Sequence, residues 1–279
     1  MGKNSRDQRA SVGVFDSGVG GLTVAREIMR NLPNEHIVYF GDTARVPYGS
    51  KSKDTIVRYS RQIIHFLRTQ DVKAIVIACN TASALALDEV ERELDIPILG
   101  VIKPGARVAV EATRNHKIGV IGTESTINSH MYKRLICEAD PSITVYEKAC
   151  PLLCPLVEEG WLKDPVTEEV AKRYLDGLLG KGIDSLILGC THYPLLRSLI
   201  REIAGDQITL VNPAYETAKE LGELLEREQL GNPDAPDEPR TAEPYRFFVS
   251  DMADKFGSFA NSILPYDIET IQKINIEDY

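Results

Sequence analysis

The chain has 279 residues, of which 43% are hydrophobic and 26% charged, and its formal net charge is −9. This is the composition of a globular protein with an ample core, large enough for two modest domains or one large one. The acidic balance argues against binding of nucleic acid or of an anionic membrane through the overall field, although a local basic groove is compatible with it.

From the sequence we expect neither a signal peptide nor a membrane span. The first ten residues are polar, no apolar stretch of the signal-peptide type follows them, and no run approaches the ~18 apolar residues of a membrane span. The five cysteines are irregularly spaced, and a chain of this size does not need disulfides. We therefore expect a cytoplasmic protein with reduced thiols and no membrane partner.

Short β-rich runs alternate with segments of helix length. Strands are predicted over 11–17, 36–42, 73–79, 98–102, 117–123, 143–149, 184–190, 208–213 and 245–251. Runs such as AIVIA and LILG are typical of strands buried on both faces of a parallel sheet. Amphipathic helices are predicted over 61–70 and over 167–179, the second ending at Gly180. The proline-rich segment 228–244 predicts an exposed loop. The alternation predicts an α/β fold with mostly parallel sheets.

The chain contains a faint internal repeat. The segments 12–18 and 118–125 are both apolar strands that end in polar or small residues and lead into a helix. Each is followed, at a similar distance, by a strand that ends at a cysteine. The pattern suggests two similar α/β halves, although any two α/β domains share this much.

Two predicted strands end at a cysteine that polar residues follow, Cys79 in IVIACNTAS and Cys190 in LILGCTHYP. Ligands of open parallel sheets bind beyond the carboxyl ends of the strands, where helices begin and their N–H groups suit a carboxylate. A cysteine at such a place is expected to be more acidic than its reference pKa of ~8.5. A lone strand cysteine is more often a small core residue, but the repetition favours a functional pair.

Three other features of the sequence are better explained by local structure than by a cofactor or metal site. In DSGVGG (16–21), Thr23 stands where a dinucleotide fingerprint needs its third glycine. The favoured reading is a turn that brings glycine N–H groups near a ligand. Cys150 and Cys154 in CPLLCP are predicted to be packed thiols in a turn rather than half of a zinc site, because no second pair exists. Cys137 is predicted to be a core residue.

Two cysteines that face each other across a cleft suit a two-base reaction. Inversion of an amino-acid α-carbon removes a proton from one face and returns one to the other, so each base must reach the α-carbon from its own side. The site must also stabilise the developing carbanion. One cysteine with a base would instead suggest a nucleophile.

Seven motifs, in this order, resemble the glutamate racemases of the cofactor-independent aspartate/glutamate racemase superfamily. They are VGVFDSGVGGLTV, FGDTARVPYGSKS, IVIACNTASA, GVIKPGA, IGVIGTESTINSHMY, CPLVEEG and LILGCTHYPLL. The resemblance implies an isomerase that interconverts L- and D-glutamate without pyridoxal phosphate, metal or nucleotide, and supplies D-glutamate for peptidoglycan. One alternative is a racemase for aspartate or another amino acid. A second is a thiol hydrolase or decarboxylase on the same fold, although the presence of two cysteines argues against a decarboxylase that uses only one.

The resemblance also implies roles for individual residues. Cys79 and Cys190 would be the acid/base thiols, with Asp16 beside the first and His192 and Glu158 beside the second. The substrate would be bound by Asp16, Ser17, Tyr48, Gly49, Asn80, Thr81, Thr123, Thr191 and His192. Val46 stands where relatives often carry cysteine, and we expect no catalytic consequence.

The family fold implies two α/β domains with the active site in the cleft between them. The first would comprise 1–102 plus 213–279, and the second 103–212. A homodimer is implied, and the short polar N-terminus favours activity without a cell-wall precursor as activator. Some relatives are associated with inhibition of DNA gyrase, and the acidic charge is compatible with such an additional role. Assays of supercoiling with and without the protein would decide it.

Overall fold

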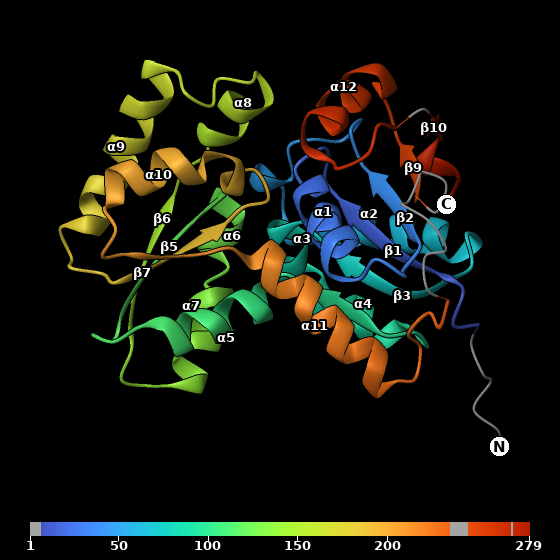
Figure 1. Cartoon of the computed structure of the whole chain (residues 1–279), viewed down its shortest axis with the longest axis horizontal. Coiled ribbons are helices and arrows are strands. Elements are labelled where there is room, and N and C mark those ends of the chain that lie inside the picture. The colour runs from blue at the N-terminus through green and yellow to red at the C-terminus, as the bar shows by residue number, and fades with distance from the viewer. Residues whose placement is uncertain (1–6, 235–244, 269) are drawn as a thin grey trace.

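The computed structural model describes residues 7–234, 245–268 and 270–279. The chain forms two parallel sheets with helices packed on their faces (Figure 1). The larger sheet has six strands in the order β10-β9-β2-β1-β3-β4, and the smaller has four in the order β6-β5-β7-β8. All the strand pairs are parallel. The predicted α/β class with parallel sheets is confirmed.

The larger sheet is built from both ends of the chain. Its strands are β1 (Ser11–Asp16), β2 (Ile37–Gly41), β3 (Val72–Ile77), β4 (Ile98–Gly100), β9 (Tyr245–Val249) and β10 (Ile271–Lys273). Strands β2 and β3 are buried throughout, as their apolar runs predict. Strand β10 was not predicted from the sequence. It is a three-residue edge strand with two exposed side chains, and it is too short to show a periodic pattern.

The smaller sheet comes from the middle of the chain. Its strands are β5 (Lys117–Gly122), β6 (Thr144–Ala149), β7 (Ser185–Gly189) and β8 (Thr209–Val211). Gly122 at the end of β5 pairs with Gly189 at the end of β7. In the larger sheet, the register places Phe15 of β1 beside Ile77 of β3. In each sheet, therefore, the chain segments that follow two neighbouring strands begin side by side at the carboxyl ends of those strands.

Twelve α-helices connect the described strands. They are α1 (Leu22–Asn31), α2 (Lys53–Thr69), α3 (Asn80–Leu85), α4 (Leu87–Val90), α5 (Ile102–Ala112), α6 (Glu124–Asn128), α7 (Met131–Ala139), α8 (Leu153–Glu158), α9 (Pro165–Leu179), α10 (Arg197–Ala204), α11 (Pro213–Arg227) and α12 (Ala253–Ile263). Helix α2 begins earlier than predicted because the Ser52 side chain accepts a hydrogen bond from the Thr55 N–H. Helix α9 begins at Pro165 after the Asp164 cap and ends at Gly180, as predicted.

Helices α5 and α11 connect the two sheets. Helix α11 packs against α1 and against α5, and it runs from the centre to the lower right of Figure 1, beneath α1. One cluster of buried side chains contains Val14 and Tyr39 of the larger sheet together with Ile118 and Ile187 of the smaller. The two cores are therefore continuous on this side of the molecule.

The structure differs from the predicted exposure of the 228–244 segment and from the predicted burial of Cys137. Residues 235–244 of the predicted loop lie outside the described residues, but Leu230 and Asn232 are buried rather than exposed. Leu230 joins the core, and the Asn232 N–H donates to the Glu35 carboxylate. Cys137 is only partly buried, on α7. Within the described part of the chain, no helix is both long enough and apolar enough to cross a membrane.

Candidate active site

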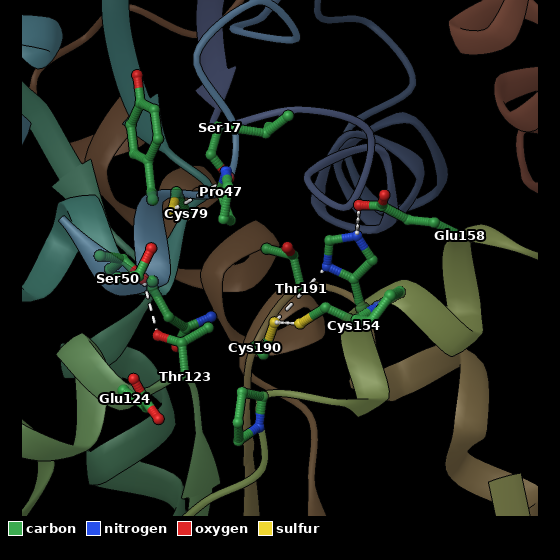
Figure 2. A pocket seen from close by; sticks show the side chains of 18 residues that line it. Ser17, Pro47, Ser50, Cys79, Thr123, Glu124, Cys154, Glu158, Cys190 and Thr191 are labelled. Atoms are coloured by element: carbon green, nitrogen blue, oxygen red, sulfur yellow. Dashed lines mark hydrogen bonds and ion pairs between the residues drawn. The ribbon is translucent and has the colours of Figure 1, made fainter.

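The strand ends of the two sheets meet at a cavity of about 390 Å³ (Figure 2), a volume in the range of small-molecule sites. The residues that follow β1, β3, β5 and β7 all reach it. Its lining comprises Ser17, Val46, Pro47, Tyr48, Gly49, Ser50, Cys79, Asn80, Thr81, Thr123, Glu124, Pro151, Cys154, Pro155, Glu158, Cys190, Thr191 and His192. Every predicted site residue except Asp16 is among them.

Cys79 lies at the start of α3, two residues after β3 ends, and is 5% exposed. Its Sγ donates to Ser17 Oγ at 3.7 Å. Burial raises the pKa of the thiol to about 12, and the neighbouring Asp16 carboxylate adds to this shift. The expectation of an acidic thiol at this strand end is therefore wrong, because burial outweighs the N–H groups of the helix start.

Cys190 directly follows β7 and is equally buried. Its Sγ lies 3.4 Å from Cys154 Sγ and 3.6 Å from His192 Nδ1. The hydrogen bond with Cys154, followed by burial, raises the pKa of the Cys190 thiol well above its ordinary value, while His192 opposes the shift. An acidic thiol was the wrong expectation here too.

His192 connects Cys190 to Glu158. Its Nε2 lies 2.9 Å from Glu158 Oε1, and because a carboxylate only accepts, Nε2–H donates. Burial alone would lower the pKa of the imidazole, but the hydrogen bonds to Cys190 and Glu158 outweigh it and raise the pKa to about 10. The same bond to His192 lowers the pKa of Glu158. The imidazole is thus held in one orientation toward the thiol.

Asp16 is fully buried and lies behind the wall of the cavity. Its Oδ2 accepts the Gly18 N–H at 2.9 Å. Burial raises the pKa of this carboxyl, while His192 and three backbone N–H groups oppose the rise. The prediction that the glycine turn places its N–H groups near a ligand is therefore wrong for Gly18, whose N–H is bonded to Asp16. Gly20 instead brings the backbone against Thr191 and His192 from the other half.

Hydroxyl and amide groups supply most of the polar lining. Thr81 Oγ1 and Thr123 Oγ1 are 2.9 Å apart, and Asn80 Oδ1 accepts from the Tyr132 hydroxyl at 2.7 Å. The Tyr48 hydroxyl is hydrogen-bonded to the buried Asp42, so this side chain meets the cavity with its ring. None of the described lining residues is lysine or arginine. A bound carboxylate would therefore depend on N–H and O–H donors.

Hydrogen bonds between the two halves surround the cavity. The Thr23 hydroxyl donates to the Thr191 carbonyl at 3.0 Å, and the Ser125 hydroxyl donates to the Gly49 carbonyl at 2.8 Å. The Tyr132–Asn80 and Thr81–Thr123 bonds also join segments that follow different sheets. These contacts fix the position of one set of strand ends relative to the other.

Cys154 lines the cavity, although the sequence predicts it to be a packed thiol in a turn. It lies on α8 and faces the cavity, with its sulfur beside Cys190 (Figure 2). The available signal was its spacing from Glu158, because residues four apart share one face of a helix. Cys154, Cys190 and His192 also form the group best suited to a metal ion, with ligand atoms within 4.8 Å of one another.

The fold and the site define an α/β protein in which two sheets each supply one buried thiol to a shared cavity. A family model described as Asp/Glu/Hydantoin racemase matches residues 13–221. The chain belongs to this family of racemases, which are isomerases, and the resemblance inferred from the motifs is confirmed.

Individual relatives are similar over their whole length. The chain is 49% identical to a glutamate racemase of Syntrophus aciditrophicus, over 99% of this chain and 100% of that protein. A solved glutamate racemase from Bacillus anthracis superimposes with a TM-score of 0.90 at 40% identity, covering 96% of this chain and 98% of that chain. Another, from Francisella tularensis in complex with D-glutamate, gives a TM-score of 0.89 at 40% identity, covering 98% and 100%.

Proposed function

We propose that the chain is a cofactor-independent glutamate racemase that interconverts L- and D-glutamate by two-base proton transfer. The observation that carries the proposal is the position of Cys79 and Cys190, two buried thiols that follow different sheets and line one cavity from different sides (Figure 2). The relatives named glutamate racemase, at up to 49% identity, support the choice of substrate.

The reaction needs one cysteine as thiolate and the other as thiol. The thiolate removes the α-proton, the electron pair stays on the α-carbon, and the opposite thiol returns a proton to the other face and becomes the thiolate. A raised thiol pKa makes the thiolate a stronger base toward a weakly acidic C–H group. The ammonium group of a bound amino acid would favour formation of that thiolate in the buried cavity.

The neighbours of each thiol are proposed to act on it. His192, oriented by Glu158, would exchange protons with or stabilise Cys190, and Asp16 with Ser17 would do so for Cys79. Asn80, Thr81, Thr123 and Thr191 would donate hydrogen bonds to the substrate carboxylates, while Tyr48 and Gly49 shape the wall.

Several finer points stay predictions. The domain division 1–102 plus 213–279 and 103–212 is proposed, supported by the strands of each sheet falling within these ranges. A homodimer and a supply of D-glutamate to peptidoglycan are proposed from the family resemblance, whereas a cytoplasmic location and independence of an activator stay predictions from the sequence. A gyrase-binding role is compatible with the net charge of −9 and is tested by supercoiling assays.

The proposal is tested by incubating L- or D-glutamate with the protein in deuterated water, following optical rotation and loss of the α-proton together. We expect both signals to change from either enantiomer, and aspartate to react far more slowly. Cys79→Ser and Cys190→Ser should each abolish net inversion, because one face of the α-carbon then lacks its acid or base. Full turnover in either variant would refute the two-base assignment, and faster turnover of aspartate would refute the substrate.

A further inference from the structure

A third thiol at the cavity, Cys154, has no part in the proposed proton transfer. Helix α8 holds its sulfur 3.4 Å from that of Cys190, which in turn lies 3.6 Å from His192 Nδ1. The three ligand atoms all lie within 4.8 Å of one another, and all three side chains line the cavity. Two sulfurs and one imidazole nitrogen thus lie close together in the wall of the cavity.

These separations fit a tetrahedral metal centre. With Zn–S bonds of ~2.3 Å and a Zn–N bond of ~2.0 Å, tetrahedral geometry places two sulfurs about 3.8 Å apart and a sulfur and a nitrogen about 3.5 Å apart. The observed Cys154–Cys190 and Cys190–His192 separations, 3.4 Å and 3.6 Å, lie close to these values, and the ligand atoms of Cys154 and His192 lie within 4.8 Å of each other.

The orientation of His192 supports the same conclusion. Its Nε2–H donates to Glu158 Oε1 at 2.9 Å, which leaves Nδ1 to face the sulfur of Cys190. Histidines that bind metals commonly donate their other ring N–H to a carboxylate in this way, which fixes the ring and the tautomer. Thiolate and imidazole ligands favour Zn²⁺ over Mg²⁺ or Ca²⁺, which prefer oxygen.

We propose that Cys154, Cys190 and His192 form a binding site for Zn²⁺ or a similarly soft divalent cation, with the fourth coordination position open to the cavity. On binding, the two thiols and Nδ1 of the His192 imidazolium release their protons to solvent, and the two sulfurs and Nδ1 bond to the metal. A bound ion thereby withdraws Cys190 from proton transfer and inhibits the enzyme. The inhibition rests on the proposed racemase function, whereas the binding does not.

The binding is tested on the full-length protein, reduced and without oxygen, with Co²⁺ as a spectroscopic substitute for Zn²⁺. We expect one ion per chain, with thiolate-to-cobalt charge-transfer absorption and the visible bands of tetrahedral cobalt, displaced by Zn²⁺ but not by Mg²⁺. Cys154→Ala should weaken binding by at least about 100-fold, because it removes a direct ligand. Cys137→Ala is the matched control, since this thiol lies on α7 outside the cavity lining, and it should bind as the unmodified protein does.

Activity provides the second measurement. Zn²⁺ should inhibit turnover of glutamate, EDTA should reverse the inhibition, and the Zn²⁺ concentration for half inhibition should rise in Cys154→Ala by the factor seen in binding. Thermal melting of this variant should match that of the unmodified protein, which shows that it is folded, and inhibition is expressed relative to the variant's own turnover in metal-free buffer. The absence of a cobalt–thiolate band, equal affinity in Cys154→Ala, or inhibition that EDTA does not reverse would each overturn the site. Cobalt binding in a protein that does not racemise glutamate would refute the proposed function and leave the site standing.

Discussion

A methyl group added at Gly20 should reduce racemisation without unfolding the protein. Gly20 lies in the turn after β1, and an added Cβ would stand 2.3 Å from Thr191 Oγ1 and 2.7 Å from His192 Nδ1, across the cleft. Because ordinary contacts begin at 3.4 Å, the Thr191 hydroxyl must move by about 1.1 Å and the His192 ring by about 0.7 Å. Gly20 has no left-handed φ, so the effect of Gly20→Ala is purely steric.

The displacement affects the Cys190 side of the site. His192 Nδ1 is 3.6 Å from Cys190 Sγ, and a shift of this size disrupts that contact or moves the thiol with it. Since a misplacement of ~1 Å can lower a rate ~100-fold, we expect kcat for inversion to fall by about 10- to 100-fold in both directions. Exchange of the α-proton of the enantiomer that Cys79 deprotonates should fall much less, because the Cys79 side is not displaced.

The assay compares initial rates of inversion with rates of deuterium incorporation for each enantiomer. Gly177→Ala is the control, because nothing lies within 4 Å of an added Cβ there, in the last turn of α9. It should keep kcat and gain about 0.5–1 kcal/mol of stability. If Gly20→Ala melts like the unmodified protein and keeps kcat within threefold, the contact across the cleft does not position His192 and the argument is wrong.

Three further variants test other contacts. Lys73→Met breaks the buried ion pair with Glu35 (2.5 Å) and should cost about 3–5 kcal/mol in urea unfolding. Its kcat at 25 °C should be unchanged, because Lys73 lies at the start of β3, far from Cys79. Tyr132→Phe removes the hydrogen bond to the amide of Asn80 and should cost about 1–3 kcal/mol and raise KM; an unchanged KM would show that this amide does not bind substrate. Glu158→Gln removes a hydrogen bond that raises the pKa of His192, so the imidazolium loses its proton at lower pH. The basic limb of the pH profile of kcat/KM should therefore move down from about 10. A limb that does not move would exclude His192 as its origin.

Much of the fold was predictable because strand ends carry strong local signals. All nine predicted strands exist within a few residues, since buried parallel strands form apolar runs that turn residues interrupt. Strand β10 was not predictable, because its pairing with β9 depends on tertiary contact rather than on its own three residues. The early start of α2 was readable from Ser52, whose side chain caps the helix.

Which residues line the cavity was largely predictable from the motifs, but their electrostatics were not. The expectation that Cys79 is acidic depends on N–H groups at a helix start, which the sequence does show. The structure adds burial and the Asp16 carboxylate, and these raise the pKa of the thiol to about 12. Burial depends on how two halves of the chain close over each other, which no local pattern encodes. For the same reason, the sequence could not show that Cys154 meets Cys190.

The two thiols reach a similar state through different neighbours. Asp16 contributes to the raised pKa of Cys79, whereas Cys154 contributes to that of Cys190, and burial contributes to both. A reversible reaction between mirror-image substrates of equal free energy needs bases of comparable strength on the two faces, so that neither direction is limited by a weak base. In the proposed two-base mechanism this need would be met without symmetry in sequence, because both thiols are buried while their specific partners differ. The partner of Cys190 is itself a thiol, which places a second sulfur, and with it the proposed metal site, next to one base of the pair.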